Sequence, residues 1–407
     1  MRLCLLCIGG EDHALRIPFL LALRDRGFRV SAAATADAGP FTRAGIDYHL
    51  FHFDRFTNPL ADWAAFKALA KLIADLRPGL VQSFDTKPNI LVPLAARNVP
   101  GVLAVRTING LAYVYSSRSP KALAFRPVWH LLHRVAARST AATVFQNRDD
   151  QDFFQRYRMI EPGMGRLIRG SGIDIDRFDR AVATGPSPAQ LRQALGLGDC
   201  EIAVTVTRLT RQKGIPTLLE AAALVHRDRP SVRFLLVGPR ESEGPNAVSQ
   251  AEIDRHAPYV RATGPRSDIP PLLQIADVFV FPTEYREGVP RALLEAAVAA
   301  RPIVTTRMPG CYDVILDGWN GFLVPPRTPR QLADRILDLL RDRENAQSMG
   351  ARAAELARKE FNLEIIVARY AALYEELMNH SVRSGQQMLE DSSEREPIRQ
   401  RVVQFGD

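Results

Sequence analysis

The chain has 407 residues, a formal net charge of +8 at pH 7, and hydrophobic residues at 46% of its positions. This length and apolar content predict two domains of ordinary size, each with its own core. Four cysteines are too few for a disulfide framework, no apolar run reaches the roughly 18–20 residues that span a bilayer, and the basic residues form no nucleic-acid motif. The basic excess suits anionic substrates or an anionic membrane face, and we expect no nucleic-acid partner.

The first half of the chain alternates strands and helices. The N-terminus runs directly into an apolar strand over Leu3–Ile8, without the charged segment and cleavage site of a signal peptide, so we expect a cytoplasmic protein. Cys4 and Cys7 lie in this strand, which favours buried side chains over a redox pair. A helix over His13–Arg26 follows. Further strands are predicted near Arg29–Ala34, Ile46–Phe53, Leu80–Phe84, Val102–Ile108, Thr143–Gln146 and Leu167–Arg169.

Glycines and polar residues follow several of these strands. Gly9 and Gly10 end the first strand, where glycine lets the backbone approach a ligand closely, although a plain tight turn explains the pair equally well. Asp85 and Lys87 follow the fourth strand and Asn109 follows the fifth. We expect these three residues on the side that faces an acceptor. Capping of the next helix by the segment around Asp85 is the alternative.

A basic and apolar segment covers residues 118–139. Its helical spacing suits docking on a membrane surface, and an ordinary helix of the first domain fits the same pattern. Pro127 is expected to interrupt a continuous helix here.

A change of composition marks the boundary between two domains. Residues 181–190 read AVATGPSPAQ, rich in small residues and proline, so we predict a first domain over 1–172, a linker over 173–199 and a second domain over 200–362. Alternation resumes at Ile202 and continues to about residue 306. The pattern predicts an α/β protein with two Rossmann-like parallel-sheet domains that face a cleft.

Two basic residues follow the first strand of the second domain. Residues 201–214 read EIAVTVTRLTRQKG, which places Arg208 and Lys213 at the carboxyl end of a parallel strand. Ligands of open α/β sheets bind at this edge. Arginine offers a planar fork for phosphate oxygens and lysine a compact charge, so the pair predicts a phosphate site.

Residues 284–297 read EYREGVPRALLEAA and carry two glutamates eight positions apart, Glu287 and Glu295. They flank a strand-to-helix turn, where the backbone N–H groups of Gly288 and Val289 favour an anion. Carboxylates accept hydrogen bonds from hydroxyls, so the segment suits a ligand with sugar hydroxyls around a phosphate. An ordinary amphipathic helix is the alternative.

Together these segments resemble the retaining glycosyltransferases of GT-B fold with the Glu-x7-Glu signature, known as glycosyl transferases group 1. RLTRQKG resembles their Arg-x4-Lys diphosphate clamp, EGVPRALLE their Glu-x7-Glu, and GSGIDIDRF (170–178) their interdomain segment. SFDTKPNILVPLAAR and TINGLAYVYS resemble the subgroup that adds amino sugars or other hexoses to lipid-linked acceptors in bacterial glycan assembly.

The resemblance implies roles for individual residues. Arg208 and Lys213 would hold the diphosphate, Glu295 the ribose hydroxyls and Glu287 the donor sugar, with the Gly9–Gly10 loop facing the diphosphate. Arg266 would stack on the nucleotide base. A final helix over 363–379 would cross back to the first domain, and residues 380–407, which lose apolar periodicity, would form a mobile polar tail.

Two features of the sequence limit which roles of family residues can be assigned to this chain. Many relatives have a histidine where this chain has Asn109, and asparagine cannot act as a general base near neutral pH. Asp174 and Asp176 form a DxD, which holds a divalent cation in GT-A transferases but binds no metal at this place in the GT-B family. We therefore expect no metal and no other cofactor.

The sequence and the resemblance predict a retaining transferase at the cytoplasmic face of the inner membrane. It would move a hexose or N-acetylhexosamine from a nucleotide diphosphate sugar, expected to be a UDP-sugar, to an undecaprenyl-diphosphate-linked glycan in cell-surface polysaccharide synthesis. The alternatives are a nucleotide-sugar epimerase of GT-B fold and a non-catalytic nucleotide-sugar-binding scaffold.

Overall fold

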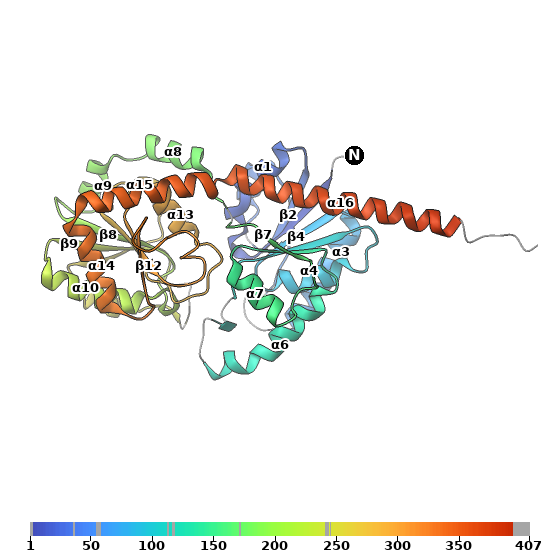
Figure 1. Cartoon of the computed structure of the whole chain (residues 1–407), viewed down its shortest axis with the longest axis horizontal. Helices are drawn as coiled ribbons and strands as arrows, with labels where there is room; N and C mark the ends of the chain where they lie inside the picture. Colours follow the sequence, from blue (N-terminus) through green and yellow to red (C-terminus); the bar gives the residue numbers. More distant parts are fainter. Residues whose placement is uncertain are drawn as a thin grey trace, which may run out of the picture.

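The computed structural model describes residues 3–35, 37–53, 58–111, 114–115, 119–170, 172–240, 244 and 246–393. Within them the chain forms two parallel sheets in separate lobes (Figure 1). The two sheets covered by helices confirm the α/β fold of two Rossmann-like domains.

The first sheet has the order β3-β2-β1-β4-β5-β6-β7, and every pair is parallel. Its strands are β1 (Cys4–Ile8), β2 (Arg29–Ala34), β3 (Asp47–Leu50), β4 (Leu80–Phe84), β5 (Leu103–Ile108), β6 (Ala142–Phe145) and β7 (Gly165–Leu167). The connecting helices are η1 (Glu11–Arg16), α1 (Ile17–Asp25), α2 (Gly39–Arg43), α3 (Pro59–Leu76), α4 (Pro88–Ala96), α6 (Pro120–Ala137) and α7 (Arg148–Arg156).

Both faces of the first sheet are buried. In β1, Leu5 and Cys7 pack into one core, while Leu6 and Ile8 pack into another. Successive strand side chains point to opposite faces, so a doubly covered strand is apolar throughout. This explains Cys7 as a packing residue, whereas Cys4 is half-buried, and both are free thiols.

The second sheet has the order β10-β9-β8-β11-β12-β13 and is also parallel. Its strands are β8 (Glu201–Val206), β9 (Val232–Val237), β10 (Val260–Gly264), β11 (Val278–Phe281), β12 (Ile303–Thr306) and β13 (Phe322–Val324). Its helices are η2 (Arg211–Lys213), α10 (Ile215–Asp228), α11 (Gln250–Asp254), α12 (Ile269–Leu273), α13 (Arg291–Val298), α14 (Pro329–Arg341) and α15 (Arg343–Glu360).

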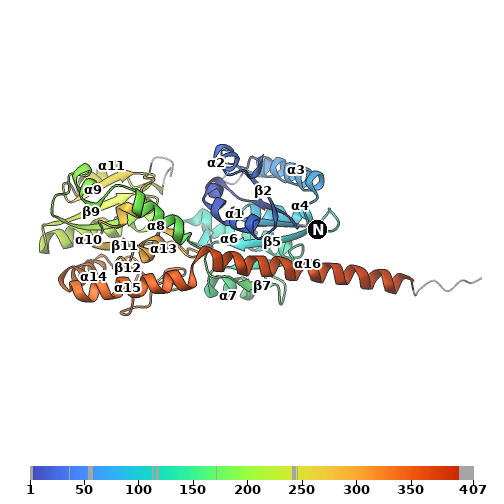
Figure 2. The same ribbon diagram turned by 90° about the horizontal axis from the view of Figure 1, so that it is seen from above.

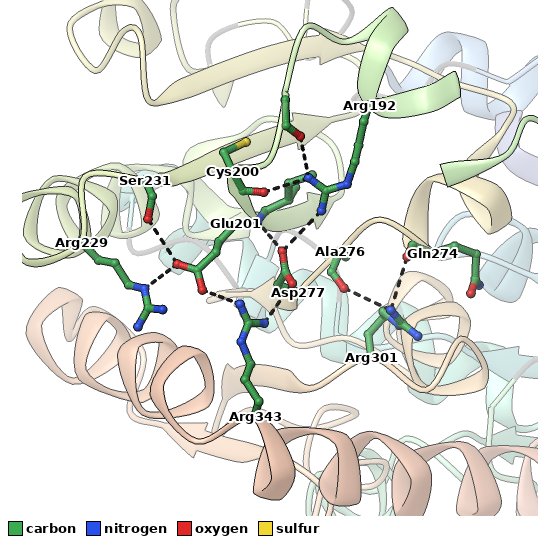
Figure 3. A network of polar contacts seen from close by, with 12 residues as sticks. Arg192, Cys200, Glu201, Arg229, Ser231, Gln274, Ala276, Asp277, Arg301 and Arg343 are labelled. Carbon is green, nitrogen blue, oxygen red and sulfur yellow. Dashed lines mark hydrogen bonds and ion pairs between the residues drawn. The ribbon is translucent and has the colours of Figure 1, made fainter. Parts of the chain in front are cut away.

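A polar network closes the amino-terminal edge of this second sheet (Figure 3). Arg343, the first residue of α15, pairs with Asp277 before β11 at 2.9 Å and with Glu201 at the start of β8. Asp277 also accepts the Ile202 N–H at 2.8 Å. The carboxyl edge of the sheet, at the other end of the strands, carries the site residues described below.

The predicted linker folds into two helices, α8 (Ile175–Thr184) and α9 (Pro188–Ala194). Both helices contact α12 of the second domain. Asp174 accepts the Arg177 N–H and caps α8, and Ser187 with Gln190 forms a capping box on α9. Local capping therefore stabilises helices in a stretch whose composition predicted an irregular linker.

The last helix, α16 (Leu363–Ser393), runs along the first domain and projects beyond it (Figures 1 and 2). Tyr374 donates to Gln82 Oε1 at 2.9 Å, and the Tyr370 hydroxyl lies 3.0 Å from Thr107 Oγ1. The expected helix end at 379 is wrong, because residues 380–393 contain no proline and the helix continues through them. Residues 394–407 of the expected tail lie outside the described residues.

Two helix predictions also need correction. The helix predicted over His13–Arg26 divides into η1 and α1, because Pro18 has no N–H and takes the second position of a new helix. Conversely, α6 continues through Pro127. Burial of Trp129, His133 and Ala136 along its inner side outweighs the hydrogen bond that proline loses. Arg118, the first residue of that predicted segment, lies outside the described residues.

Candidate active site

A lysine and a glutamate from different loops meet at the carboxyl edge of the second sheet. Lys213 ends the short helix η2 after β8, and its ammonium pairs with the carboxylate of Glu287, from the loop after β11. Their side chains are 9% and 15% exposed. A Cβ at Gly214, where φ is 72°, would lie 1.9 Å from the Pro282 carbonyl oxygen. Glycine is therefore required to bring η2 against the β11 loop.

Further groups hold this pair in place. Thr283, which is fully buried, donates from its hydroxyl to Glu287 Oε1 at 3.3 Å. The Lys213 Nζ lies 5.0 Å from the ring centroid of Tyr285, within the range of a cation–π contact. Arg208 follows β8 by two residues and is half-buried. These positions place two cationic side chains at the edge where α/β sheets bind ligands.

Glu295 lies on α13 and is held by a neighbour. Arg291 donates from Nε to Glu295 Oε1 at 3.0 Å, and donates from a second nitrogen to the Leu15 carbonyl in the first domain at 3.2 Å. The Glu295 side chain is 15% exposed. One arginine thus connects the second predicted glutamate to the opposite domain.

The loop between the two glutamates docks on the first domain. Gly288 donates its N–H to the Asn109 carbonyl at 3.2 Å, and Val289 donates to Gln146 Oε1 at 3.1 Å. A Cβ at Gly288 would lie 1.9 Å from Gln146 Oε1, so a larger residue would force the Gln146 side chain to move. Both N–H groups were predicted to face a phosphate. In this arrangement they are already used, and their part in donor binding stays a prediction.

A second set of contacts between the domains was missed by the sequence analysis. Asn147 donates to the Glu287 carbonyl at 3.1 Å, and Arg286 pairs with Asp150 at 3.1 Å. Asp150 is fully buried, and burial raises its pKa to about 6. The available signal was the polar run that begins directly after β6, because all carboxyl ends of a parallel sheet meet at one edge.

On the first domain, Asp85 gathers several predicted residues. It accepts the Gly10 N–H at 2.9 Å, an Arg16 N–H at 3.2 Å and the Asn109 side-chain amide at 3.4 Å. Its φ of 70° is unusual for a non-glycine residue. Burial acts to raise the pKa of Asp85, but the Arg16 guanidinium and the Gly10 N–H outweigh it, so the pKa lies below its ordinary value. Asp85 is therefore an anion that faces the second domain's loop.

The glycine pair has a packing explanation on the same edge. A Cβ at Gly9 would lie 2.2 Å from Nδ1 of the buried His13, and the Gly10 N–H is used by Asp85. Close packing therefore requires Gly9. The predicted contact of this loop with a diphosphate stays a prediction.

Two predicted residues have other partners. Lys87 pairs with Asp62 of α3 at 2.6 Å. Arg266 makes two hydrogen bonds to Asp268, at 2.7 and 2.5 Å, which raise the pKa of its guanidinium. A bidentate pair two positions along the chain fixes the edge of the guanidinium, so stacking of Arg266 on a base stays a prediction.

A cavity of about 120 Å³ lies beside Asp85. Its lining includes Asp85 and Asn109 from the first domain and Tyr285 from the second. The cavity therefore lies where the acceptor side was expected. Within the described part of the chain, no group of three or more His, Cys, Asp or Glu side chains is arranged to hold a metal ion.

Comparison with known proteins gives matches over most of the chain. Residues 19–177 match Glycosyltransferase Family 4, and residues 200–342 match Glycosyl transferases group 1. The chain is 26% identical over 375 residues to N,N'-diacetylbacillosaminyl-diphospho-undecaprenol alpha-1,3-N-acetylgalactosaminyltransferase of Campylobacter jejuni, covering 91% of this chain and 97% of that protein.

A second relative is UDP-Gal:alpha-D-GlcNAc-diphosphoundecaprenol alpha-1,3-galactosyltransferase of Escherichia coli, 26% identical over 268 residues, with 65% of this chain and 67% of that protein covered. Among solved structures, HepE from Anabaena in complex with UDP-glucose has a TM-score of 0.76 at 20% identity, covering 92% of this chain and all of that one. This last likeness shows a shared fold.

Proposed function

The chain belongs to the glycosyltransferases, with a family 4 domain in its first half and a group 1 domain in its second, and we propose its substrates and stereochemistry. It moves a hexose or an N-acetylhexosamine from a UDP-sugar to an undecaprenyl-diphosphate-linked glycan, with retention of the anomeric configuration. The product is an intermediate of cell-surface polysaccharide synthesis.

One observation carries this proposal: the ammonium of Lys213 is held beside Glu287 at the carboxyl edge of the second sheet, facing the first domain's Asp85 and Asn109 edge. The ammonium and the Arg208 guanidinium supply positive charge for a diphosphate. Glu287 and Glu295 supply acceptors for sugar and ribose hydroxyls. The site thus divides into a cationic donor side and an acceptor side.

The proposed reaction proceeds on the front face of the donor sugar. The bond from the anomeric carbon to the diphosphate oxygen breaks as the acceptor hydroxyl approaches from the same side. A bond from the anomeric carbon to the acceptor oxygen forms, and the acceptor proton passes to the leaving diphosphate oxygen. Arg208 and Lys213 stabilise the charge that develops on the diphosphate. This role of the two side chains replaces a metal cofactor.

The names of the relatives support the substrate classes. The Escherichia coli relative is named for UDP-Gal as donor, and both reported relatives are named for acceptors linked to diphosphoundecaprenol. No helix in the described residues combines the length and apolar character needed to cross a membrane. We propose that the enzyme meets its acceptor at the cytoplasmic face of the inner membrane by peripheral docking.

The outer side of α6 supports docking of this kind. Leu123, Val128 and Leu131 are 45%, 47% and 58% exposed. The exposed Lys121 and Arg134 lie on the same helix. Apolar side chains can enter the headgroup region while the basic ones meet anionic lipid.

The function is tested by product analysis. The protein is incubated with a panel of UDP-sugars and with undecaprenyl diphosphates that carry one sugar. Transfer with retained configuration supports the proposal. An epimerised donor without transfer would identify an epimerase, and donor that stays unchanged while UDP still binds would identify a scaffold.

The docking is tested by flotation with vesicles of neutral or anionic lipid. We expect the protein to bind anionic vesicles, and Leu131→Glu to weaken that binding about tenfold or more. Leu316→Glu, at a position 50% exposed in the second domain, is the matched control and should bind like the wild type. Equal binding of the two variants would exclude α6 as the docking surface.

A further inference from the structure

Three buried side chains between β6 and the first turn of α7 contact one short loop of the second domain, residues 286–289. Gln146, Asn147 and Asp150 are at most 5% exposed. Gln146 Oε1 accepts a main-chain N–H of the loop at 3.1 Å, and Asn147 donates to a carbonyl of the loop at 3.1 Å. Asp150 pairs with the arginine of the loop at 3.1 Å. The first domain therefore holds the loop that carries Glu287.

Asn147 serves both domains with one side chain. Its Oδ1 accepts the Asp150 N–H at 2.8 Å and so caps α7. Its Nδ2 donates to Asp150 Oδ2 at 3.1 Å and to the Glu287 carbonyl at 3.1 Å. A side-chain amide has two N–H donors, so one is used within the first domain and the other across the domain boundary. The cap thereby fixes the direction in which the second donor points.

Glu287 is held by both domains. Its carboxylate pairs with Lys213 and accepts the Thr283 hydroxyl, both in the second domain. Its main chain forms an isolated antiparallel bridge with Gly110 of the first domain. A Cβ at Gly110, where φ is 107°, would lie 2.3 Å from the Arg286 carbonyl oxygen, so glycine lets the two main chains approach this closely. The side chain of Glu287 is thus oriented by one domain and its backbone by the other.

We propose that Gln146, Asn147 and Asp150 are positioning residues, which hold Glu287 in the orientation that sugar transfer requires. The inference rests on the proposed function, because it concerns the glutamate assigned there to the donor sugar. A displacement of about 1 Å at an active site can lower a rate by about 100-fold. Side chains that act only through Glu287 can therefore have a large effect on kcat.

The alternative role of these contacts is only to join the two domains. A buried ion pair such as that of Asp150 with Arg286 adds little stability compared with well-packed apolar side chains. The pKa of Asp150 is raised to about 6 by burial, so keeping its carboxylate charged at neutral pH costs folding free energy. The pair is therefore a weak source of stability. Its hydrogen bond is directional, however, and restricts the orientation of the loop.

The variant Asn147→Ser separates capping of α7 from the bond across the domain boundary. Serine caps helices about as well as asparagine, but it lacks the amide N–H that reaches the Glu287 carbonyl. We expect kcat to fall about tenfold or more, while the protein stays folded in circular dichroism and binds UDP with unchanged affinity in calorimetry. Asp342→Ser changes the cap of α15 at the opposite edge of the second sheet. It is the matched control and should behave like the wild type. A wild-type kcat in Asn147→Ser would overturn the proposal for this residue.

The variant Asp150→Asn separates activity from stability. Asparagine keeps the shape of Asp150 and removes its buried charge, so the midpoint of urea unfolding at pH 8 should be no lower than that of the wild type. The hydrogen bond from Arg286 loses its ionised acceptor, so kcat should fall about fivefold or more. A parallel fall of kcat and of the unfolding midpoint would indicate a merely structural role, and an unchanged kcat would exclude Asp150 from positioning.

A double-mutant cycle identifies the residue through which the positioning residues act. Asn147→Ser is combined with Glu287→Gln, which removes the carboxylate that the bond would position. We expect Asn147→Ser to lower kcat by less than about threefold in this background, because effects that pass through one group are not additive. Equal losses in the wild-type and Glu287→Gln backgrounds would contradict action through Glu287.

Hydrogen exchange without substrate separates this inference from the function on which it rests. The N–H groups of Gly288 and Val289 donate to the first domain, so they should exchange slowly in the wild type. Asn147→Ser and Asp150→Asn should speed their exchange about tenfold and leave the strand Val278–Phe281 unchanged. If no acceptor is glycosylated, the proposed function fails, and the exchange rates still test whether the first domain holds the loop. Unchanged exchange of the loop in both variants would overturn the inference.

Discussion

Replacing Lys213 with methionine tests the ion pair and the diphosphate role at once. Methionine keeps the length of the side chain and removes its charge. Glu287, whose side chain is 15% exposed, would keep the Thr283 hydroxyl as its remaining side-chain partner among the described contacts. Removing one partner of a fully buried pair costs about 3–5 kcal/mol. Because both side chains here retain some access to solvent, we expect a loss of roughly 2–3 kcal/mol in the free energy of unfolding.

The double variant Lys213→Met/Glu287→Gln separates stability from catalysis. Glutamine removes the unpaired charge and keeps the shape of Glu287, so the free energy of unfolding should return to within about 1 kcal/mol of the wild type. Transfer should not return, because a positive group aimed at the developing charge lowers the barrier by about 3–4 kcal/mol, or a few hundredfold in rate. Urea unfolding followed by circular dichroism and single-turnover transfer rates measure the two effects.

Two results would refute this reasoning. If the double variant transfers sugar nearly as fast as the wild type, Lys213 serves only to neutralise Glu287, and the diphosphate assignment is wrong. If Lys213→Met alone leaves the free energy of unfolding unchanged, the ion pair is screened by solvent and the expected loss of stability is wrong. Lys71→Met, which breaks a solvent-exposed pair with Asp75 on α3, is the control and should change neither quantity measurably.

Three further outcomes are expected. Arg208→Ala should lower transfer at least tenfold while urea unfolding stays near that of the wild type. Glu295→Gln should weaken UDP binding in calorimetry, whereas Glu287→Gln should spare it and impair transfer; equal losses of UDP affinity would contradict the division between ribose and sugar. Burial raises the pKa of Asp150 to about 6, above an unfolded value of about 3.9. The contribution of Asp150 to stability is therefore complete below about pH 4 and is lost as the pH rises through 6, by up to roughly 3 kcal/mol. Asp150→Asn should abolish that part of the pH dependence of urea unfolding.

Much of the fold could be predicted from the sequence, because it depends on local patterns. Runs such as Ile202–Val206 and Val278–Phe281 carry no charged residue and show no polar alternation, as is typical of strands covered on both faces. The Lys213–Glu287 pair was foreseeable in part, since both residues follow parallel strands and such ends share one edge. The extent of α16 was not, because apolar periodicity is lost after residue 379 while the helix itself continues to Ser393.

The rest of the site depends on contacts between residues far apart in the chain. The Gly288 N–H donates to the Asn109 carbonyl, and no local pattern in either segment predicts this contact. The contact of Arg106 with His133 likewise joins two different elements. The Arg266 pair with Asp268 is the exception, because two residues of opposite charge two positions apart could have been read as partners.

Asn109, in the first domain, makes contacts with both domains. Its carbonyl accepts the N–H of Gly288, next to Glu287, while its side chain donates to Asp85 and lines the cavity beside it. Separation of the domains would break the first contact and displace Glu287 from the acceptor. Whatever fills the cavity and steadies Asn109 therefore also favours the arrangement in which the donor residues are complete. If donor and acceptor both favour this arrangement, thermodynamic reciprocity requires each to raise the other's affinity by the same factor, and the kinetics of the ternary complex should show synergy.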